Sequence, residues 1–475
     1  MRFSLNLRMP RIQLIKPGSK LDLFLGRHLG SEQFSYQEIF SMFFPILVDQ
    51  FFLYFMNILT TSMVSASSQE AVSAVSLVSP IFSMISAIFG AVSAGGTVIV
   101  AQYKGRGDGA KTRLAAGQVV LTTVIIGVLS CAVMIIFAKP LLNLLYAGLE
   151  PLVLEKAVQY MIGLGISLIS FAFYMGCFAV FRGTGASKVC LNLTVIINGA
   201  YLLASILFLN ILKLDIVGTG LALNAARILG GVCAVISLMN PGSPTRVSLG
   251  DIFRVDFGIL GSVFKVGIPF AFEQLFASGG TLIVQTYLVA FGTASVAANA
   301  ITNSLLSVMY AAGASVMTLS ITIVGQCIGA KDHDLARKYG KRMTIMTTVM
   351  NCISIVIFAP ALPLLLGLFQ APAETTDIIY SLLWIAIPAL PLFWSVSSVI
   401  PGVLRSAGDS AFASAVSLII TWVVSVGLGW VFCFPMGMQV HGLWVATVVG
   451  WAVRTVIFWI RFRGKAWLTK KAIKD

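Results

Sequence analysis

The chain reads PILVDQFF from Pro45 and PFAFEQLF from Pro269. Each stretch opens with a proline and carries an acid, Asp49 or Glu273, that is followed by a glutamine. The two stretches are 224 residues apart (45 to 269), and both lie in apolar runs long enough to cross a bilayer as helices. The pattern predicts one helical unit that occurs twice along the chain.

Two further pairs of segments keep this spacing to within one residue. VAQYKGRGDGAKTR (100–113) matches VGQCIGAKDHDLAR (324–337) at the same offset of 224. FRGTGAS (181–187) matches LRSAGDS (404–410) at an offset of 223. Chance does not hold one register over six helices, so the sequence predicts an internal repeat.

The composition excludes a soluble globular protein. The chain has 475 residues, of which 58% are hydrophobic and 11% charged, and its mean hydropathy is +0.93. Soluble domains carry about 25% charged residues. In lipid, a spanning segment must satisfy its own backbone hydrogen bonds, and apolar runs of this length do so as helices.

Breaks at glycine, proline, serine and charge clusters divide the chain into twelve predicted transmembrane helices. They cover residues 38–64, 73–102, 114–146, 155–181, 188–211, 216–239, 258–290, 295–328, 337–368, 376–404, 411–434 and 440–460.

The distribution of positive charge supports this count, because short cytoplasmic loops collect lysine and arginine. With the N-terminus inside, 27 of the 32 lysines and arginines fall on the cytoplasmic side, among them Arg182 and Arg405 in short loops. Only Lys139, Lys156 and Lys213 fall on the opposite side. The sequence therefore predicts a multi-pass protein of the cell (inner) membrane with both termini in the cytoplasm.

These assignments divide the chain into five segments. They are a basic cytoplasmic tail (1–34), an N-terminal six-helix lobe (35–239), a cytoplasmic linker (240–256), a C-terminal six-helix lobe (257–463) and a second basic tail (464–475). Because six is an even number, both lobes begin on the same side of the membrane. The predicted fold class is an all-α membrane protein whose two parallel repeats are related by a pseudo-twofold axis along the membrane normal.

Ionisable groups inside a bilayer are costly and mark function, and two acids, Asp49 and Glu273, lie deep in the predicted helices. At 100° per residue, both lie on polar faces, of the first and the seventh helix. Matched polar faces favour one water-filled cavity between the lobes, although hydrogen bonds that join helices would also explain them. The candidate ion- and substrate-binding residues are Asp49, Gln50, Asn57, Thr60, Asn198, Glu273, Gln274, Thr281 and Gln285.

Such a cavity provides a way to couple two solutes. Removal of a carboxylate from water favours its neutral form, so a buried acid can exchange a proton. A proton or a sodium ion and an organic cation would then compete for the same acid. The seven cysteines form no CxxC pair and the three histidines no cluster, so the sequence predicts no metal site and no cofactor beyond the coupling ion.

The repeated P-x-x-x-[DE]-Q opening, the two [GA]-Q-x-x-G loops after the second and eighth helices, and the six-plus-six arrangement resemble the multidrug and toxic compound extrusion (MATE) family. The resemblance covers about residues 35–463. It implies two helix bundles packed in a V shape. It also implies antiport of amphipathic organic cations or drugs against protons or sodium by rocker-switch alternating access. The expected partners are a small organic cation and the lipid bilayer, and we expect a monomer.

The chain departs from the family pattern at its usual ion-binding acids. Thr60, Leu202 and Ala277 stand where many members have an acid. These departures weigh against sodium coupling through the family's site in the first half. Asp49 and Glu273 remain as the predicted carriers of the coupling ion.

Two other transport functions stay open. A flippase for lipid-linked precursors would need several cationic residues in its cavity to bind pyrophosphate, whereas the predicted interior offers mainly acids. A dedicated exporter of one metabolite or peptide also fits the repeat. An enzyme would need convergent nucleophile, base or metal groups, and nucleic-acid binding would need a basic folded domain. The sequence shows neither, so it predicts no enzyme and no nucleic-acid partner.

Overall fold

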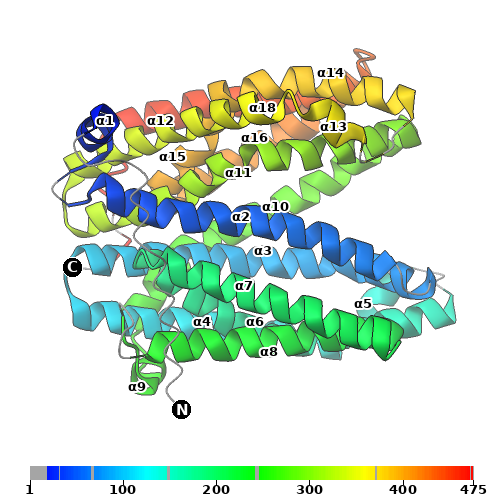
Figure 1. Cartoon of the computed structure of the whole chain (residues 1–475), viewed down its shortest axis with the longest axis horizontal. Helices are drawn as coiled ribbons and strands as arrows, with labels where there is room; N and C mark the ends of the chain where they lie inside the picture. The colour runs from blue at the N-terminus through cyan, green and yellow to red at the C-terminus, as the bar shows by residue number, and fades with distance from the viewer. Residues whose placement is uncertain are drawn as a thin grey trace.

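The computed structural model describes residues 19–31, 33–65, 69–146, 150–240, 245–367, 369, 372–470 and 472–473, and every regular element in them is a helix (Figure 1). The long helices run side by side along the long axis of the molecule. The prediction of a helical membrane protein is confirmed by these helices and by their length and apolarity.

The first half of the chain forms eight elements. They are α1 (Lys20–Leu29), α2 (Tyr36–Ser65), α3 (Gln69–Gly105), α4 (Gly109–Ile136), α5 (Ala138–Leu145), α6 (Pro151–Gly183), α7 (Ser187–Ser205), which continues as the π-helical turn η1 (Ile206–Ile211), and α8 (Asp215–Met239).

The second half repeats this order with more interruptions. Its elements are α9 (Leu249–Phe253), α10 (Phe257–Ala290), α11 (Thr293–Gly329), α12 (His333–Phe358), α13 (Leu362–Gly367), α14 (Ala373–Ala389), η2 (Leu390–Trp394), α15 (Ser395–Ser406), α16 (Ser410–Ile420), η3 (Thr421–Leu428), α17 (Gly429–Cys433) and α18 (Gln439–Arg463).

Within the described residues, 11 helices are long and apolar enough to cross a membrane, and they follow the second to the twelfth predicted spans in order. Helix α2, with 30 residues, covers the first predicted span. Two predicted ends were wrong: 114–146 ends as a helix at Ile136, and 337–368 ends at Phe358. Pro140 and Pro360 follow these ends, and a proline has no backbone N–H to donate to the carbonyl four residues before it, which interrupts a helix there. The apolar run continues past both prolines, which is why hydropathy alone missed them.

Large apolar side chains along these helices are exposed. Examples are Leu203 at 70%, Val356 at 73% and Ile136 at 67%. Soluble proteins rarely expose apolar surface on this scale. The exposed faces therefore suit hydrocarbon rather than water.

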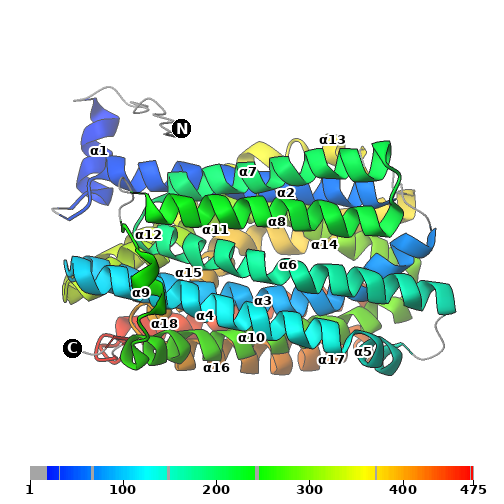
Figure 2. The same ribbon diagram turned by 90° about the horizontal axis from the view of Figure 1, so that it is seen from below.

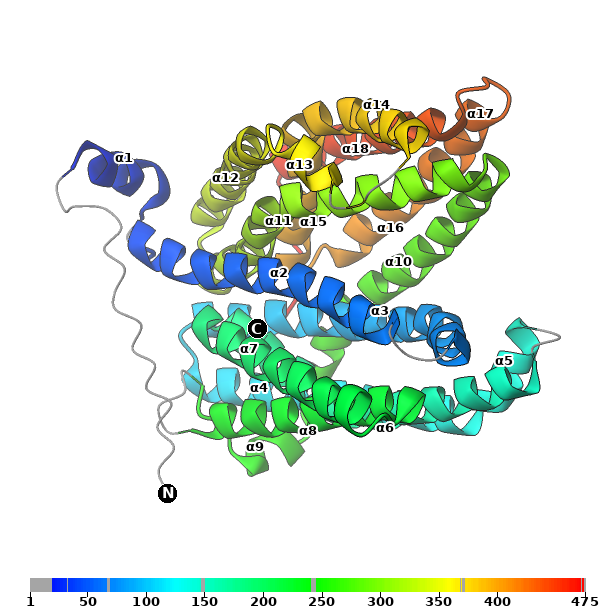
Figure 3. The same ribbon diagram turned by 45° about the vertical axis from the view of Figure 1, so that its right-hand side comes forward.

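The long helices form two groups, with α2 and α10 between them (Figure 3). Helices α3, α4, α6, α7 and α8 pack together in the first group, and α11, α12, α14, α15 and α18 in the second. Helix α2 packs on α7 of the first group and on α11 of the second. Helix α10 packs on α3 and on α16. Helix α2, from the first half of the sequence, and helix α10, from the second, therefore each connect the two halves of the chain.

The helix α1, the helix α9 and the C-terminus all lie at one end of the molecule, called here the terminal end (Figure 2). The parts of the predicted tails that the structure describes are docked there rather than extended. Arg342 of α12 donates to the carbonyl oxygen of Gly30 at 3.0 Å, and Arg337 donates to the carbonyl oxygen of Gly464 at 2.9 Å. Trp467, beyond α18, is fully buried.

The repeated loops fold alike at the terminal end. Asp108 accepts a hydrogen bond from the backbone N–H of Lys111 at 2.9 Å, and Asp332 accepts one from Leu335 at 2.8 Å. An aspartate in this position satisfies a backbone donor that the first turn of a helix leaves free. The two loops therefore start α4 and α12 by the same local mechanism.

The two helix groups meet closely where α3 crosses α11. A Cβ atom on Gly105 would lie 1.9 Å from the backbone oxygen of Gln326, and one on Gly329 would lie 1.9 Å from that of Gln102. Side-chain amides also cross this junction. Gln102 Nε2 donates to the carbonyl oxygen of Ser406 at 2.6 Å, and Gln326 Nε2 donates to that of Gly183 at 3.1 Å.

The glycine contact predicts a measurable change in stability. Gly105→Ala places a methyl group against a backbone oxygen, and such overpacking costs about 1–3 kcal/mol. We expect a lower midpoint of unfolding for the purified protein in detergent. Gly109→Ala is the matched control, because a Cβ there meets nothing within 4 Å. Equal unfolding of Gly105→Ala and the unaltered protein would show that the helices do not approach this closely.

Candidate functional site

Asp49 of α2 is buried, with 2% of its surface exposed, and is paired with Arg182 of α6. Arg182 Nη2 lies 3.4 Å from Asp49 Oδ2. The guanidinium also lies over the ring of Phe178, 4.3 Å from its centroid, and Thr194 of α7 lies beside the carboxylate. The first predicted acid therefore occupies an ion pair among α2, α6 and α7.

Glu273 of α10 makes the equivalent pair in the second half. Arg405 Nη2, at the end of α15, lies 2.5 Å from Glu273 Oε2. The guanidinium of Arg405 lies over the ring of Phe270, 4.1 Å from its centroid. Both members of this pair are nearly covered, since 11% of each side chain is exposed. An aromatic ring against each guanidinium adds cation–π attraction in a setting of low dielectric.

The sequence analysis placed Arg182 and Arg405 in loops and missed both pairs. In the structure, each arginine lies in the last turn of its helix and points to the acid of the same half. The signal was present in the sequence, because the segments around these arginines keep the repeat register of the acids. A buried acid needs a compensating charge. Arg182 and Arg405 stand at matching positions of the repeat, so they were the candidates for that charge.

Each ion pair adjoins the junction between the helix groups. Gly183, which accepts a hydrogen bond from Gln326, follows Arg182 directly, and Thr322 of α11 donates to the carbonyl oxygen of Arg182 itself at 2.9 Å. Likewise Ser406, which accepts from Gln102, follows Arg405. A displacement of either arginine would therefore act on the backbone that joins the two groups.

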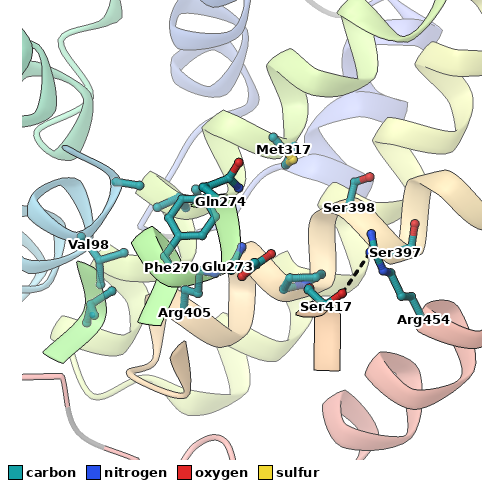
Figure 4. Close-up of a pocket in the computed structure, with 16 residues that line it drawn as sticks. Val98, Phe270, Glu273, Gln274, Met317, Ser397, Ser398, Arg405, Ser417 and Arg454 are labelled. Carbon is teal, nitrogen blue, oxygen red and sulfur yellow. Dashed lines mark hydrogen bonds and ion pairs between the residues drawn. The ribbon is translucent and has the colours of Figure 1, made fainter. Parts of the chain in front are cut away.

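A cavity of about 220 Å³ lies against the second pair (Figure 4). Helices α10, α11, α15, α16 and α18 surround it, and α3 closes one side. It is lined by Ala94, Gly95, Val98, Val266, Phe270, Glu273, Gln274, Met317, Ile321, Ser397, Ser398, Pro401, Gly402, Arg405, Ser417 and Arg454. Asp49 does not line it. The expectation that both acids face one cavity is therefore not met: the structure places each acid in its own ion pair, in opposite halves.

The charges of this cavity differ from the expected acidic interior. Arg454 of α18 donates to the carbonyl oxygen of Ser417 at 3.1 Å and to Thr421 Oγ1 at 2.5 Å. The cavity thus holds two arginines and one acid. A further buried arginine, Arg227 of α8, lies over the rings of Phe82 and Phe171.

The other candidate residues are less closely associated with the two ion pairs and the cavity. Gln274 lines the cavity beside Glu273, whereas Thr281 and Gln285 are exposed farther along α10. Gln50 is half-buried on α2. Asn198 of α7 donates to the carbonyl oxygen of Thr194. The side chains of Asn57 and Thr60 lie outside the described part of the structure, so their assignment to the site stays a prediction.

Among the described residues, no group of three or more His, Cys, Asp or Glu side chains could hold a metal ion. The acids that approach the membrane interior occur singly, each beside an arginine. The prediction that no cofactor is needed stays a prediction.

The chain is similar to known transporters over most of its length. The MatE family model matches residues 45–209 and 269–431. The uncharacterized transporter YisQ of Bacillus subtilis is 25% identical over 442 residues, which cover 91% of this chain and 95% of YisQ. The probable multidrug resistance protein NorM of Listeria innocua is 23% identical, with 90% and 94% covered.

Solved structures share the fold. A structure described as "Crystal structure of MATE in the straight conformation" has a TM-score of 0.82 at 18% identity and covers 90% of this chain and 95% of its own. A transporter of the MOP superfamily from Pyrococcus furiosus, whose description reports a binding pocket of reverse polarity, also has a TM-score of 0.82. It is 19% identical and covers 92% of this chain and 97% of its own.

A double-mutant cycle tests the first ion pair. Asp49→Asn and Arg182→Gln are each expected to destabilise the protein, and residues in contact typically show coupling energies of about 0.5–3 kcal/mol. The measurement is the free energy of unfolding in detergent for the two single variants and the double variant. Asp49→Asn combined with Arg227→Gln is the control, for which we expect additive effects. Additive effects of Asp49→Asn and Arg182→Gln would contradict the pairing.

Proposed function

Because this chain belongs to the MatE family of multidrug and toxic compound extrusion transporters, we propose that it exports small amphipathic organic compounds, including drugs, by alternating access. The observation that carries the proposal is the adjacency of each buried acid–arginine pair to a hydrogen bond across the junction. In such an arrangement, the binding of an ion to the acid can favour the opening of the contact between the helix groups.

We propose that the membrane domain has twelve helices in two parallel six-helix repeats, with α2 as the first span. The family model matches twice, from residue 45 and from residue 269, and this spacing is that of the repeated motif. With both repeats starting on one side, a pseudo-twofold axis lies along the membrane normal. The positive-charge distribution supports a cytoplasmic location of the terminal end, in a cell membrane.

In this orientation the junction of α3 and α11 is a closed cytoplasmic gate. A rocker-switch motion would separate the two helix groups there and expose the cavity to the cytoplasm. The hydrogen bonds across the contact include those of Gln102, Gln326 and Thr322. Hydrogen bonds of this kind contribute about 0.5–1.5 kcal/mol each, and a ligand that binds the open state better can offset that cost.

Proton or sodium binding at Asp49 or Glu273 is the proposed driving event. Neutralisation of either carboxylate removes the charge that holds its arginine, and an unpaired buried guanidinium is costly. A new position of the arginine then becomes lower in free energy. The adjacent residue, Gly183 or Ser406, is displaced with the arginine. Exchange of the ion for the exported compound would make the protein a secondary active antiporter.

The substrate charge is proposed without the restriction to organic cations. The expectation of a cationic substrate rested on two buried acids without basic partners. The structure pairs both acids with arginine. Relatives named as multidrug resistance proteins support efflux of varied small molecules. A lipid-linked precursor flippase and a dedicated metabolite exporter remain alternatives without support from these relatives. We propose a monomer that is a transporter rather than an enzyme.

Transport by acid variants tests the coupling. In proteoliposomes that export an ethidium-type dye, Asp49→Asn and Glu273→Gln should each lower the rate by about tenfold or more, because each removes a group whose charge changes during the cycle. Separate pH and sodium gradients identify the driving ion. Normal transport by the single and double variants would refute the assignment. Transport of a lipid-linked precursor in place of dyes would favour the flippase.

Labelling of the junction tests the gate. Ala101 is fully buried and faces Gly325 across the α3–α11 crossing. In a background without native cysteines, Ala101→Cys should react slowly with a charged maleimide added from the cytoplasmic side. Gln326→Leu removes one hydrogen bond from the junction and should raise the labelling rate by about threefold to tenfold. An unchanged rate, with Asn303→Leu as the control on the exposed part of α11, would show that the amides do not hold the gate.

A further inference from the structure

The cavity beside the second ion pair contains a positive charge that no acid balances. Glu273 is engaged by Arg405 at 2.5 Å. Arg454 of α18 donates only to the uncharged oxygens of Ser417 and Thr421 among the described residues. One acid and two guanidinium groups leave a net charge of +1 in the cavity when Glu273 is ionised.

Each of the two arginines also has one covered donor atom. The Nε atoms of Arg405 and Arg454 are buried and have no hydrogen-bond partner within the described residues. Arg405 itself is more than nine-tenths buried, with 9% exposed. A buried donor without an acceptor costs about 1–3 kcal/mol, and an uncompensated charge in a membrane protein costs more. An anionic ligand in the cavity would balance this charge.

The rest of the lining suits the apolar part of such a ligand. Phe270, Met317, Ile321 and Val98 form apolar walls. Gln274 and Ser398 add uncharged polar groups to the same lining (Figure 4). The cavity therefore offers an apolar wall and a positive, hydrogen-bonding end within one space of about 220 Å³.

We propose that this cavity receives an anionic group of the exported compound, a carboxylate, sulfonate or phosphate, with Arg454 as its principal anchor. This inference rests on the proposed export function and names the substrate class of the same site: amphipathic molecules that carry an anionic group, either alone or as part of a zwitterion. A planar guanidinium binds such groups through paired charge-assisted hydrogen bonds. Arg405 supports the site through its charge but is largely engaged by Glu273.

Two xanthene dyes provide a matched test. Rhodamine 110 carries a carboxylate on its pendant phenyl ring, and rhodamine 123 is the methyl ester of the same molecule, so the two differ in one anionic group. Binding is measured by fluorescence polarisation with the full chain in nanodiscs of phosphatidylcholine, and empty nanodiscs correct for partition into lipid. We expect rhodamine 110 to bind about tenfold more tightly, which corresponds to about 1.4 kcal/mol.

Three variants locate the preference. Arg454→Gln should abolish the difference between the dyes, and Arg454→Lys should retain part of it, because lysine keeps the charge but not the paired donors. Arg227→Gln is the matched control, since Arg227 is a buried arginine of the last long helix in its half, as Arg454 is a partly buried one in the other, but Arg227 does not line the cavity. It should leave the difference unchanged.

The outcomes separate this inference from the export function. Equal binding of the two dyes by the unaltered protein, or tighter binding of rhodamine 123, would overturn the anionic site, and this comparison does not depend on the folding of any variant. A difference that survives Arg454→Gln would also overturn it. If rhodamine 110 binds preferentially but neither dye crosses proteoliposomes under a pH or sodium gradient, the site stands and the export function fails. If both dyes cross without a binding preference, the export function stands and the anionic site fails.

Discussion

Two glutamine side chains hold the contact on which the arrangement of the helix groups depends. Gln102 and Gln326 each cross the junction and donate to a backbone carbonyl of the other half, at Ser406 and Gly183. These contacts require the helices to approach closely, which Gly105 and its repeat partner allow by having no side chain. Polar groups buried at this depth need their partners, so the junction has few alternative geometries and suits a contact that is either made or broken.

The buried charges are organised around this contact. In each half one ion pair, Asp49–Arg182 or Glu273–Arg405, adjoins it, and the arginine directly precedes a residue whose carbonyl belongs to the junction. In a medium of low dielectric, removal of one partner is far more costly than the pair itself. The position of a helix end is therefore linked to the charge state of an acid on another helix. This linkage needs no long pathway, because the arginine of the ion pair and the carbonyl of the junction belong to neighbouring residues.

The two halves share this scaffold but differ in chemistry. Arg454 of α18 corresponds, at the repeat offset, to Gly230 of α8, whereas Arg227 of α8 corresponds to Trp451 of α18. The paired charges are thus duplicated and the additional arginines are not. In the second half the additional arginine lines a cavity, while in the first it lies between two aromatic rings. An internal repeat can in this way keep a common gate and specialise one half for ligand binding.

The sequence by itself determined the helical membrane fold, the positions of the long helices and the two acids, because hydropathy, helix length and an internal repeat are properties of contiguous residues. It misjudged two helix ends, where apolar runs continue beyond Pro140 and Pro360. Only the tertiary structure decided what the acids face. Asp49 and Glu273 meet arginines 133 and 132 residues away, and such contacts depend on how helices pack and rotate rather than on local pattern. Packing also brought Arg454 into the cavity, and so replaced an expected acidic interior with a positive one.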